Sequence, residues 1–130
     1  MKKITEYLKK AGVFFVATAE GDQPRVRPFG AAAEFEGRIY LCTNNKKPCY
    51  AQIAANPKVE ISGMTGEGEW IRVTGELVRD DRDEARAAML REYPELGGMY
   101  RVGDGIFEVL YLKNPVGVLC SFTAAPVTLD

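Results

Sequence analysis

Histidine is absent from this sequence of 130 residues, which removes the most frequent general base and the commonest metal ligand. The three cysteines, Cys42, Cys49 and Cys120, are odd in number and have no paired spacing. Neither a disulfide framework nor a metal site is therefore expected. No stretch reaches the length of a membrane span, and the N-terminus lacks the apolar run of a signal peptide. These features predict a cytoplasmic protein with reduced thiols.

An excess of charge of either sign is missing as well. Seventeen basic residues stand against eighteen acidic ones, which gives a net charge of −1. The chain as a whole therefore has no general attraction for nucleic acid. Its hydrophobic fraction of 46% and charged fraction of 27% are typical of a soluble globular protein. With no repeats or linkers, we predict a single domain over residues 1–130.

Short strand patterns dominate the chain, and only brief helical patterns interrupt them. Apolar or alternating runs predict strands over residues 13–19, 25–35, 39–43, 58–62, 70–78, 106–112 and 116–122, the last two joined as a hairpin at 113–115. Helices are expected over residues 4–11 and 48–55, and a third from a capping box formed by Asp81 and Glu84, which Pro94 ends.

Consecutive strands joined by tight turns predict a mainly β protein, either an antiparallel barrel or a sandwich. Gly75 lies inside the predicted strand over 70–78, where a glycine indicates a bulge. Several strands are apolar on both faces, more than a small barrel interior can cover. We therefore expect part of this surface to pack against a second copy of the chain.

Two arginines alternate along the segment QPRVRPFG, residues 23–30. In an extended strand Arg25, Arg27 and Phe29 share one face. Two guanidiniums on one face either form an exposed polar surface or bind an anion, and arginine suits phosphate because its fork binds two oxygens. Pro28 withholds a backbone donor from the sheet, which indicates an edge or a distortion that a flat ligand can approach.

A second polar segment, LCTNNKKPCYAQ, lies at a predicted strand-to-helix junction. Thr43 offers a hydroxyl, Asn45 or a neighbouring residue is a candidate helix cap, and Lys46 and Lys47 bring two positive charges. The free N–H groups at the helix start at Pro48 also favour negative charge. This segment is either a solvated turn or the binding site of an anion.

The two segments flank one predicted hairpin, so their four cationic side chains are expected to lie close together. A phosphomonoester of about two negative charges suits such a cluster. Trp70 shares a predicted strand face with Arg72 and Thr74. It is either a core residue or a cover for a planar ligand. Cys42 and Cys49 are expected to pack as small apolar residues, because no histidine activates them.

The ordered set FFVATAEGDQPRVRPFG, EGRIYLCTNNKKPCYAQIAANPKVEIS and WIRVTGELV resembles the FMN-binding split-barrel superfamily, the pyridoxamine 5′-phosphate oxidase-like proteins. The resemblance covers about residues 4–122 and rests on the order of the segments rather than on any single motif. It implies a six-stranded antiparallel split β-barrel. It also implies a homodimer with FMN bound at the subunit interface.

The resemblance also implies which residues bind the cofactor. Arginine, threonine and lysine side chains would hold the phosphate, the backbone at 28–30 would approach the flavin ring, and Trp70 would reach the flavin of the partner subunit. The expected FMN-binding residues are Arg25, Arg27, Pro28, Phe29, Thr43, Asn45, Lys46, Lys47, Gln52 and Trp70. No catalytic residue is assigned, because the cofactor itself carries the redox chemistry.

The resulting hypothesis is an FMN-dependent oxidoreductase that acts on an unknown small molecule. The vitamin B6 oxidase of this superfamily uses an Arg-x-His pair for its substrate, so oxidation of pyridoxamine phosphate is not expected of a chain without histidine. One alternative is a flavin carrier or electron-transfer module without catalysis. Another is a small barrel that binds nucleic acid, which the net charge disfavours.

Overall fold

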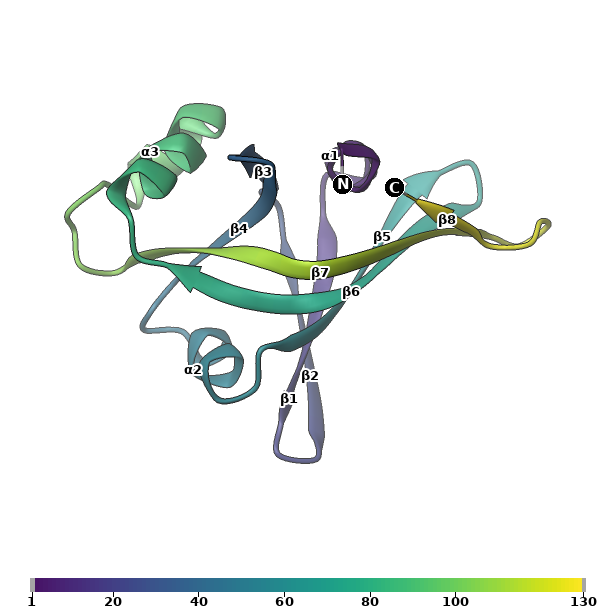
Figure 1. Ribbon diagram of the computed structural model, residues 1–130, viewed down its shortest axis with the longest axis horizontal. Coiled ribbons are helices and arrows are strands. Elements are labelled where there is room, and N and C mark those ends of the chain that lie inside the picture. Colours follow the sequence, from purple (N-terminus) through teal and green to yellow (C-terminus); the bar gives the residue numbers. More distant parts are fainter. Residues whose placement is uncertain (1, 130) are drawn as a thin grey trace.

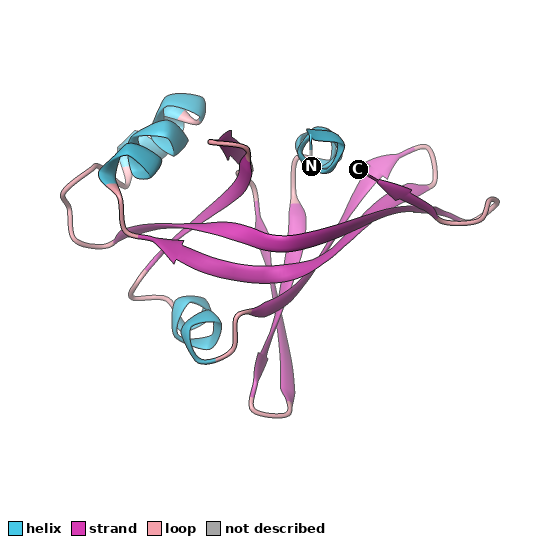
Figure 2. Cartoon of the chain, viewed as in Figure 1, coloured by secondary structure: helices cyan, strands magenta, loops and turns pink. Residues whose placement is uncertain are grey.

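One curved antiparallel sheet organises the chain, and three short α-helices lie against it (Figure 1, Figure 2). A computed structural model describes residues 2–129. The strands are β1 (Phe14–Glu20), β2 (Gln23–Phe29), β3 (Ala33–Phe35), β4 (Arg38–Asn44), β5 (Lys58–Gly66), β6 (Glu69–Asp80), β7 (Phe107–Ser121) and β8 (Val127–Leu129). The helices are α1 (Lys2–Ala11), α2 (Pro48–Ala55) and α3 (Asp83–Glu92), followed by the short 3-10 helix η1 (Pro94–Gly98).

The strand order is β2-β1-β5-β6-β7-β4-β3, with β8 beside β7. All of these pairs are antiparallel, which confirms the mainly β antiparallel prediction. Within residues 2–129 the two terminal strands of this order, β2 and β3, do not pair, so the sheet is open. The sheet has eight strands rather than the six that the resemblance implies, and two of them, β3 and β8, are only three residues long.

The hairpin predicted at residues 113–115 is wrong, because β7 runs unbroken through them. On β7, Asn114 and Pro115 lie between the partners of Thr74 and Glu76, whereas β6 has only Gly75 at this point. The turn-forming residues therefore make a bulge, with Asn114 at a φ of 52°. A Cβ on Gly75 would lie 2.8 Å from the Leu112 side chain and 3.1 Å from the Lys113 carbonyl oxygen, so glycine fits at the bulge without displacing either group.

The strand predicted over residues 25–35 is in fact two strands. The chain leaves β2 after Phe29 and crosses to the other end of the sheet, where β3 pairs with β4. Residues 31–33 are all alanines and all buried, so the crossing passes through the interior. This crossing brings both ends of the open sheet to the same part of the molecule.

Helix α1 covers one side of the sheet with Ile4 and Leu8, which belong to the main core cluster. Its close approach depends on Gly117 of β7, where a Cβ would lie 2.7 Å from the Ile4 side chain. A second cluster lies under α3 and contains Tyr40, Met89 and Phe107. None of the α-helices within residues 2–129 is long and apolar enough to cross a membrane.

The capping box predicted at the start of α3 is also wrong. The N-cap is Arg82, and no side chain caps the helix. Asp81 instead accepts hydrogen bonds from Arg79 and Arg86, while Asp80 accepts one from the backbone N–H of Arg82 at 3.1 Å. Since arginines surround these carboxylates, they form ion pairs rather than a helix cap.

Candidate functional site

A cleft of about 420 Å³ opens where the two ends of the sheet approach each other. Three segments line it: the end of β2 with the residues that follow, the β4–α2 junction, and the stretch after α3. The lining residues are Arg27, Pro28, Phe29, Gly30, Ala31, Cys42, Thr43, Lys47, Cys49, Tyr93, Glu95, Leu96, Met99 and Tyr100. A second depression of about 660 Å³ adjoins it, shares Arg27, Pro28, Lys47 and Cys49, and extends to Arg25 and Gln52.

Arg27 is half-buried between the two hollows and is held by neutral partners. Its Nη1 donates to the Val16 carbonyl at 3.1 Å and to Thr18 Oγ1 at 2.8 Å. Its Nη2 donates to Gln52 Oε1 at 2.5 Å. Within residues 2–129, Arg27 makes no ion pair with a carboxylate. The guanidinium therefore retains its positive charge at the cleft without a counter-ion from the described chain.

Thr43 and Lys47 meet Arg27 at this cleft, as expected, but not through the expected hairpin. Arg27 lies on β2, whose partner is β1, while Thr43 lies on β4, between β7 and β3. The link is α2, since Gln52 of this helix bonds Arg27. Thr43 is buried and Lys47 is exposed at the cleft mouth, and no ion pair of Lys47 occurs in the described part of the chain.

Both cleft thiols stay protonated at neutral pH. Burial raises the pKa of Cys42 to about 11, although the nearby Lys47 ammonium acts in the opposite direction. Burial likewise raises the pKa of Cys49, against the smaller effect of Arg27. Since the thiolate is the reactive form, neither side chain is an activated nucleophile. The expectation that Cys49 packs in the core is confirmed, because it belongs to the main core cluster.

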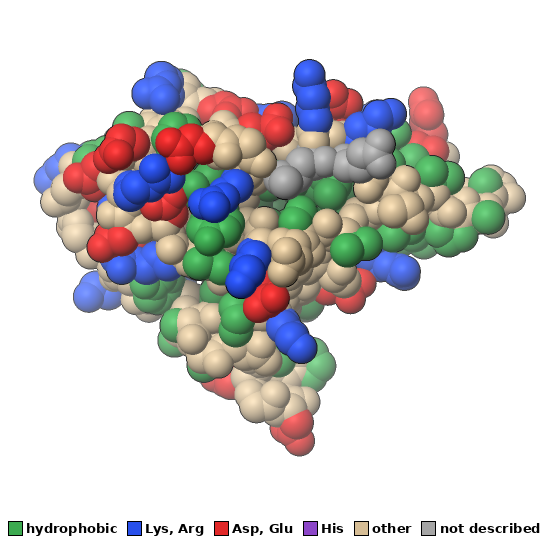
Figure 3. Space-filling model, viewed as in Figure 1, with side chains coloured by type: hydrophobic (Ala, Val, Ile, Leu, Met, Phe, Trp, Pro, Cys, Tyr) green, Lys and Arg blue, Asp and Glu red, His purple; other side chains and the backbone are tan. Residues whose placement is uncertain are grey.

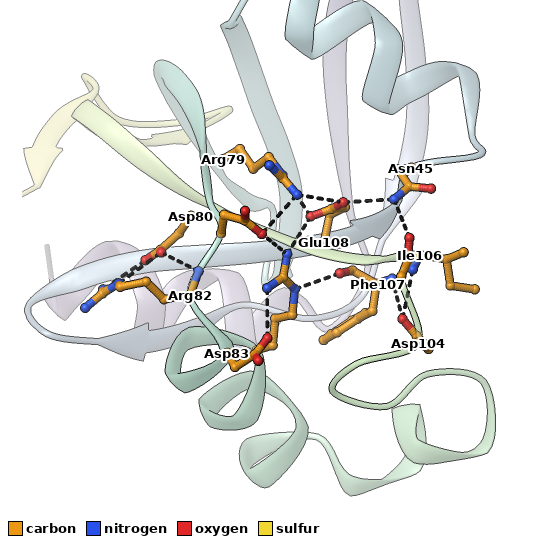
Figure 4. A network of polar contacts seen from close by, with 12 residues as sticks. Asn45, Arg79, Asp80, Arg82, Asp83, Asp104, Ile106, Phe107 and Glu108 are labelled. Carbon is orange, nitrogen blue, oxygen red and sulfur yellow. Dashed lines mark hydrogen bonds and ion pairs between the residues drawn. The ribbon is translucent and has the colours of Figure 1, made fainter.

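Asn45 does not cap α2, which corrects the prediction made from the sequence. Lys47 occupies the N-cap position with extended backbone and no side-chain bond. The Asn45 side chain does not line the cleft, and its Nδ2 donates to Glu108 Oε2 and to the Gly105 carbonyl, both at 2.9 Å (Figure 4). Asn45 therefore fastens the β4–α2 junction to the start of β7.

Glu108 is the centre of this second polar cluster. It is 3% exposed and also accepts hydrogen bonds from Arg79 and Arg86 at 3.0 Å (Figure 4). Burial alone would raise the pKa of Glu108, but the hydrogen bonds from Arg79, Asn45 and Arg86 lower it below its ordinary value. On the face drawn in Figure 3, Lys and Arg side chains are interspersed with Asp and Glu side chains.

The other predicted site residues lie at different distances from the cleft. Arg25 donates to the exposed Glu20 carboxylate at 3.0 Å, so its charge is partly neutralised at the adjoining depression. Lys46 is exposed and does not line the cleft. Trp70 packs against Phe122 with ring centroids 4.9 Å apart and lies outside the cleft.

One wall of the cleft was largely missed by the sequence reading. Tyr93, Leu96 and Met99 come from η1 and from the residues that cap it on either side. The Tyr93 hydroxyl accepts from the Ala32 N–H at 3.2 Å and donates to the Ala32 carbonyl at 3.1 Å, which fixes this wall to the crossing chain. The only indication in the sequence was the pair of tyrosines, Tyr93 and Tyr100, on either side of residues 94–99. Because one ends a predicted helix and the other lies in a predicted loop, the pattern did not bring them together.

Comparison with known proteins places the chain in a family. The sequence model described as pyridoxamine 5′-phosphate oxidase matches residues 1–105. A NimC/NimA family protein from Clostridium acetobutylicum is 53% identical, with a TM-score of 0.94 over 99% of this chain and 93% of that one. A comparison with curated proteins gave no match.

Two more distant structures share the fold. A pyridoxamine 5′-phosphate oxidase-related, FMN-binding protein from Nostoc punctiforme is 17% identical, with a TM-score of 0.62 over 97% of this chain and 91% of that one. A heme-binding protein from Mycobacterium smegmatis is 16% identical, with a TM-score of 0.73 over 95% and 57% of the two chains. With the family match over residues 1–105, the chain belongs to the pyridoxamine 5′-phosphate oxidase family.

Proposed function

We propose that this chain binds FMN in the cleft and acts as a flavin-dependent oxidoreductase on a small molecule. The observation that carries the proposal is Arg27, a half-buried guanidinium whose described partners are all neutral. A charge taken partly out of water is unfavourable without a counter-charge, and a phosphate ester supplies one. The FMN-binding relative of the same fold supports flavin as the bearer of that phosphate.

The residues around the cleft fit a flavin nucleotide. Arg27, Lys47 and Thr43 offer a guanidinium, an ammonium and a hydroxyl to the phosphate. The opposite wall contains Tyr93, Leu96, Met99 and Tyr100, which are suited to a planar, largely apolar ring. The cleft volume of about 420 Å³ lies within the range of about 300–1,000 Å³ that is usual for ligand pockets.

A homodimer is part of the same proposal. Several large apolar side chains are exposed on this subunit, among them Phe15, Met64, Val116 and Phe122. Exposed apolar surface of this extent is typical of an interface. Because Trp70 and Phe122 lie away from their own cleft, any contact of theirs with flavin would be made in the partner subunit's site.

The cofactor and the cleft residues would have different roles in the reaction. When bound, FMN supplies the hydride and electron chemistry. Arg27 and Lys47 hold its phosphate, and the wall around Tyr93 and Tyr100 limits the access of water. The protonated thiols Cys42 and Cys49 do not attack the substrate. The substrate of the oxidoreductase is a small molecule that enters the open side of the cleft.

Cofactor binding is tested by the visible absorption spectrum of the purified protein and by titration of the apoprotein with FMN. We expect flavin absorption that is released on denaturation, and saturable binding of FMN at micromolar concentrations. If the apoprotein does not bind FMN at these concentrations, the proposal is wrong.

Catalysis is tested separately, since a flavin carrier would also pass the binding test. The bound flavin is photoreduced, and its reoxidation by small-molecule acceptors is compared with that of free FMN at the same concentration. Reduction by NAD(P)H is compared in the same way. We expect the protein to accelerate at least one half-reaction. Equal rates for bound and free FMN throughout would instead indicate a carrier.

A further inference from the structure

Two buried polar side chains hold Arg27, and neither of them lines the main cleft. Thr18 of β1 is 4% exposed and Gln52 of α2 is 7% exposed. The Thr18 hydroxyl donates to Gln52 Oε1 at 2.7 Å and accepts from Arg27 Nη1 at 2.8 Å. Gln52 Oε1 also accepts from Arg27 Nη2 at 2.5 Å. The three side chains therefore form a closed triangle.

The triangle leaves one edge of the guanidinium open. Arginine carries five N–H donors in a rigid planar fork. Three of those on Arg27 are committed, to the Val16 carbonyl, to Thr18 and to Gln52. In the part of the chain that the structure describes, Nε–H and the second N–H of Nη2 have no partner. Two adjacent N–H groups of this kind bind two oxygens of a phosphate at once.

Packing of the core does not explain why residue 18 carries a hydroxyl group. Phe14, Val16 and Thr18 are the inward-facing residues of β1, and the first two are core residues. Valine has the shape of threonine and would continue this apolar row without a buried polar group. The hydroxyl is accounted for by its two bonds, one to Gln52 and one from Arg27.

We propose that Thr18 and Gln52 are positioning residues, which hold Arg27 so that its Nε–Nη2 edge faces the phosphate of the ligand. Gln52 then acts through Arg27 and does not itself contact the cofactor. The inference rests on the proposed function for the identity of the ligand. The triangle predicts that these residues control the preference for a phosphorylated flavin over an unphosphorylated one.

The first test compares FMN with riboflavin, which lacks the phosphate, in Thr18→Val. The dissociation constant for FMN is expected to rise about tenfold, while that for riboflavin is unchanged. Thr18→Ser keeps the hydroxyl and is expected to bind FMN as the wild type does. Thr65→Val is the matched control, because Thr65 is also buried but bonds the Glu69 carbonyl in the β5–β6 hairpin.

A double-mutant cycle separates positioning from a general structural role. If Thr18 acts through Arg27, Thr18→Val has no further effect on FMN affinity in an Arg27→Ala background. Equal losses of FMN and riboflavin affinity in Thr18→Val, or additive losses in the double variant, would overturn the inference. Such results would leave the proposed function intact, provided that the wild type binds FMN.

A flavin-free measurement distinguishes the inference from the function on which it rests. Inorganic phosphate is titrated into the apoprotein while the Nε–H resonance of Arg27 is followed by NMR. We expect a saturable shift in wild type, Thr18→Ser and Thr65→Val, and a shift that saturates only at about tenfold higher phosphate concentration in Thr18→Val. Phosphate binding without FMN binding would support the positioning and contradict the proposed function. A wild type that binds neither ligand would overturn both.

Discussion

A pair of arginines and a single arginine lie on either side of the β4–α2 junction, and the two sites differ in their partners. On one side, Arg79 and Arg86 each pair with the carboxylate of Glu108 at 3.0 Å. On the other side, Arg27 bonds only a carbonyl, a hydroxyl and an amide. Both sites contain half-buried or buried charge. Only the first is neutralised by the described chain itself.

This difference separates a structural role from a ligand-binding role. A carboxylate that accepts hydrogen bonds from two guanidiniums satisfies their charge internally and leaves little for a ligand to gain. A guanidinium with neutral partners keeps its charge and two donors for an incoming anion. Asn45 and Lys47 are only two positions apart but belong to different sites. Asn45 bonds Glu108, whereas Lys47 lines the cleft. The predictions below test this comparison.

Glu108→Ala is expected to give the largest effect, a loss of about 3 kcal/mol in the free energy of unfolding. The substitution leaves Arg79 without its buried partner and weakens the ties of Arg86 and Asn45. Urea denaturation measures the loss. Glu60→Ala, which removes an exposed ion pair with Arg72, is the control and should change stability by less than about 1 kcal/mol. If Glu108→Ala also lost less than about 1 kcal/mol, the structural role of Glu108 would be contradicted.

Arg27→Ala is expected to act on the ligand rather than on stability. We expect the dissociation constant for FMN to rise about 100-fold, because a charged fork to the phosphate is lost. Thr18 and Gln52 still bond each other in the variant, so the free energy of unfolding should change little. Calorimetric titration and denaturation measure the two quantities. Arg27→Lys retains the charge without the fork and should fall between wild type and Arg27→Ala.

Lys47→Ala is expected to weaken FMN binding about tenfold, since an exposed ammonium at the cleft mouth makes a smaller contribution than Arg27. Lys46→Ala is the matched control, because the neighbouring lysine does not line the cleft. The sequence alone could not distinguish the two. Equal effects of both substitutions on FMN affinity would show that the cleft acts only through its general positive field.

Asp80→Asn is expected to give the smallest effect, and one that depends on pH. The hydrogen bond from the Arg82 guanidinium lowers the pKa of Asp80 from 3.8 to about 2. A carboxyl group whose pKa is lowered by folding stabilises the fold at pH values above its ordinary pKa. This contribution is lost as the pH falls from about 4 to 2. The wild type should be more stable than Asp80→Asn at neutral pH, and this difference should largely disappear near pH 2. A difference that persists at pH 2 would exclude this ion pair as its source.

Local sequence patterns predicted much of the fold, but they failed where tertiary context decided the outcome. The runs over 13–19 and 39–43 are strands, as their apolar content predicts. Asn114 and Pro115 carry turn signals, yet pairing with β6 on one side and β4 on the other keeps β7 continuous around a bulge. Which strand pairs where is a non-local property, and periodicity does not encode it.

The candidate site was predicted in the same uneven way. The residue types of Arg27, Thr43 and Lys47 indicated a phosphate, and all three line the cleft. The pattern could not show that Glu20 neutralises Arg25, or that Glu108 draws Asn45 away, because both depend on side-chain neighbours. Thr18 was not identified, since its alternation within β1 resembles that of a core residue.

The central claim is that the unpaired arginine recognises a phosphate and the paired arginines do not. The most direct test is the ratio of the riboflavin and FMN dissociation constants in wild type, Arg27→Ala and Arg79→Ala. Arg79 provides the comparison because it pairs with Glu108 outside the cleft. We predict that the wild type prefers FMN, that Arg27→Ala loses this preference and that Arg79→Ala retains it. An unchanged ratio in Arg27→Ala, or an equal fall in Arg79→Ala, would contradict the account.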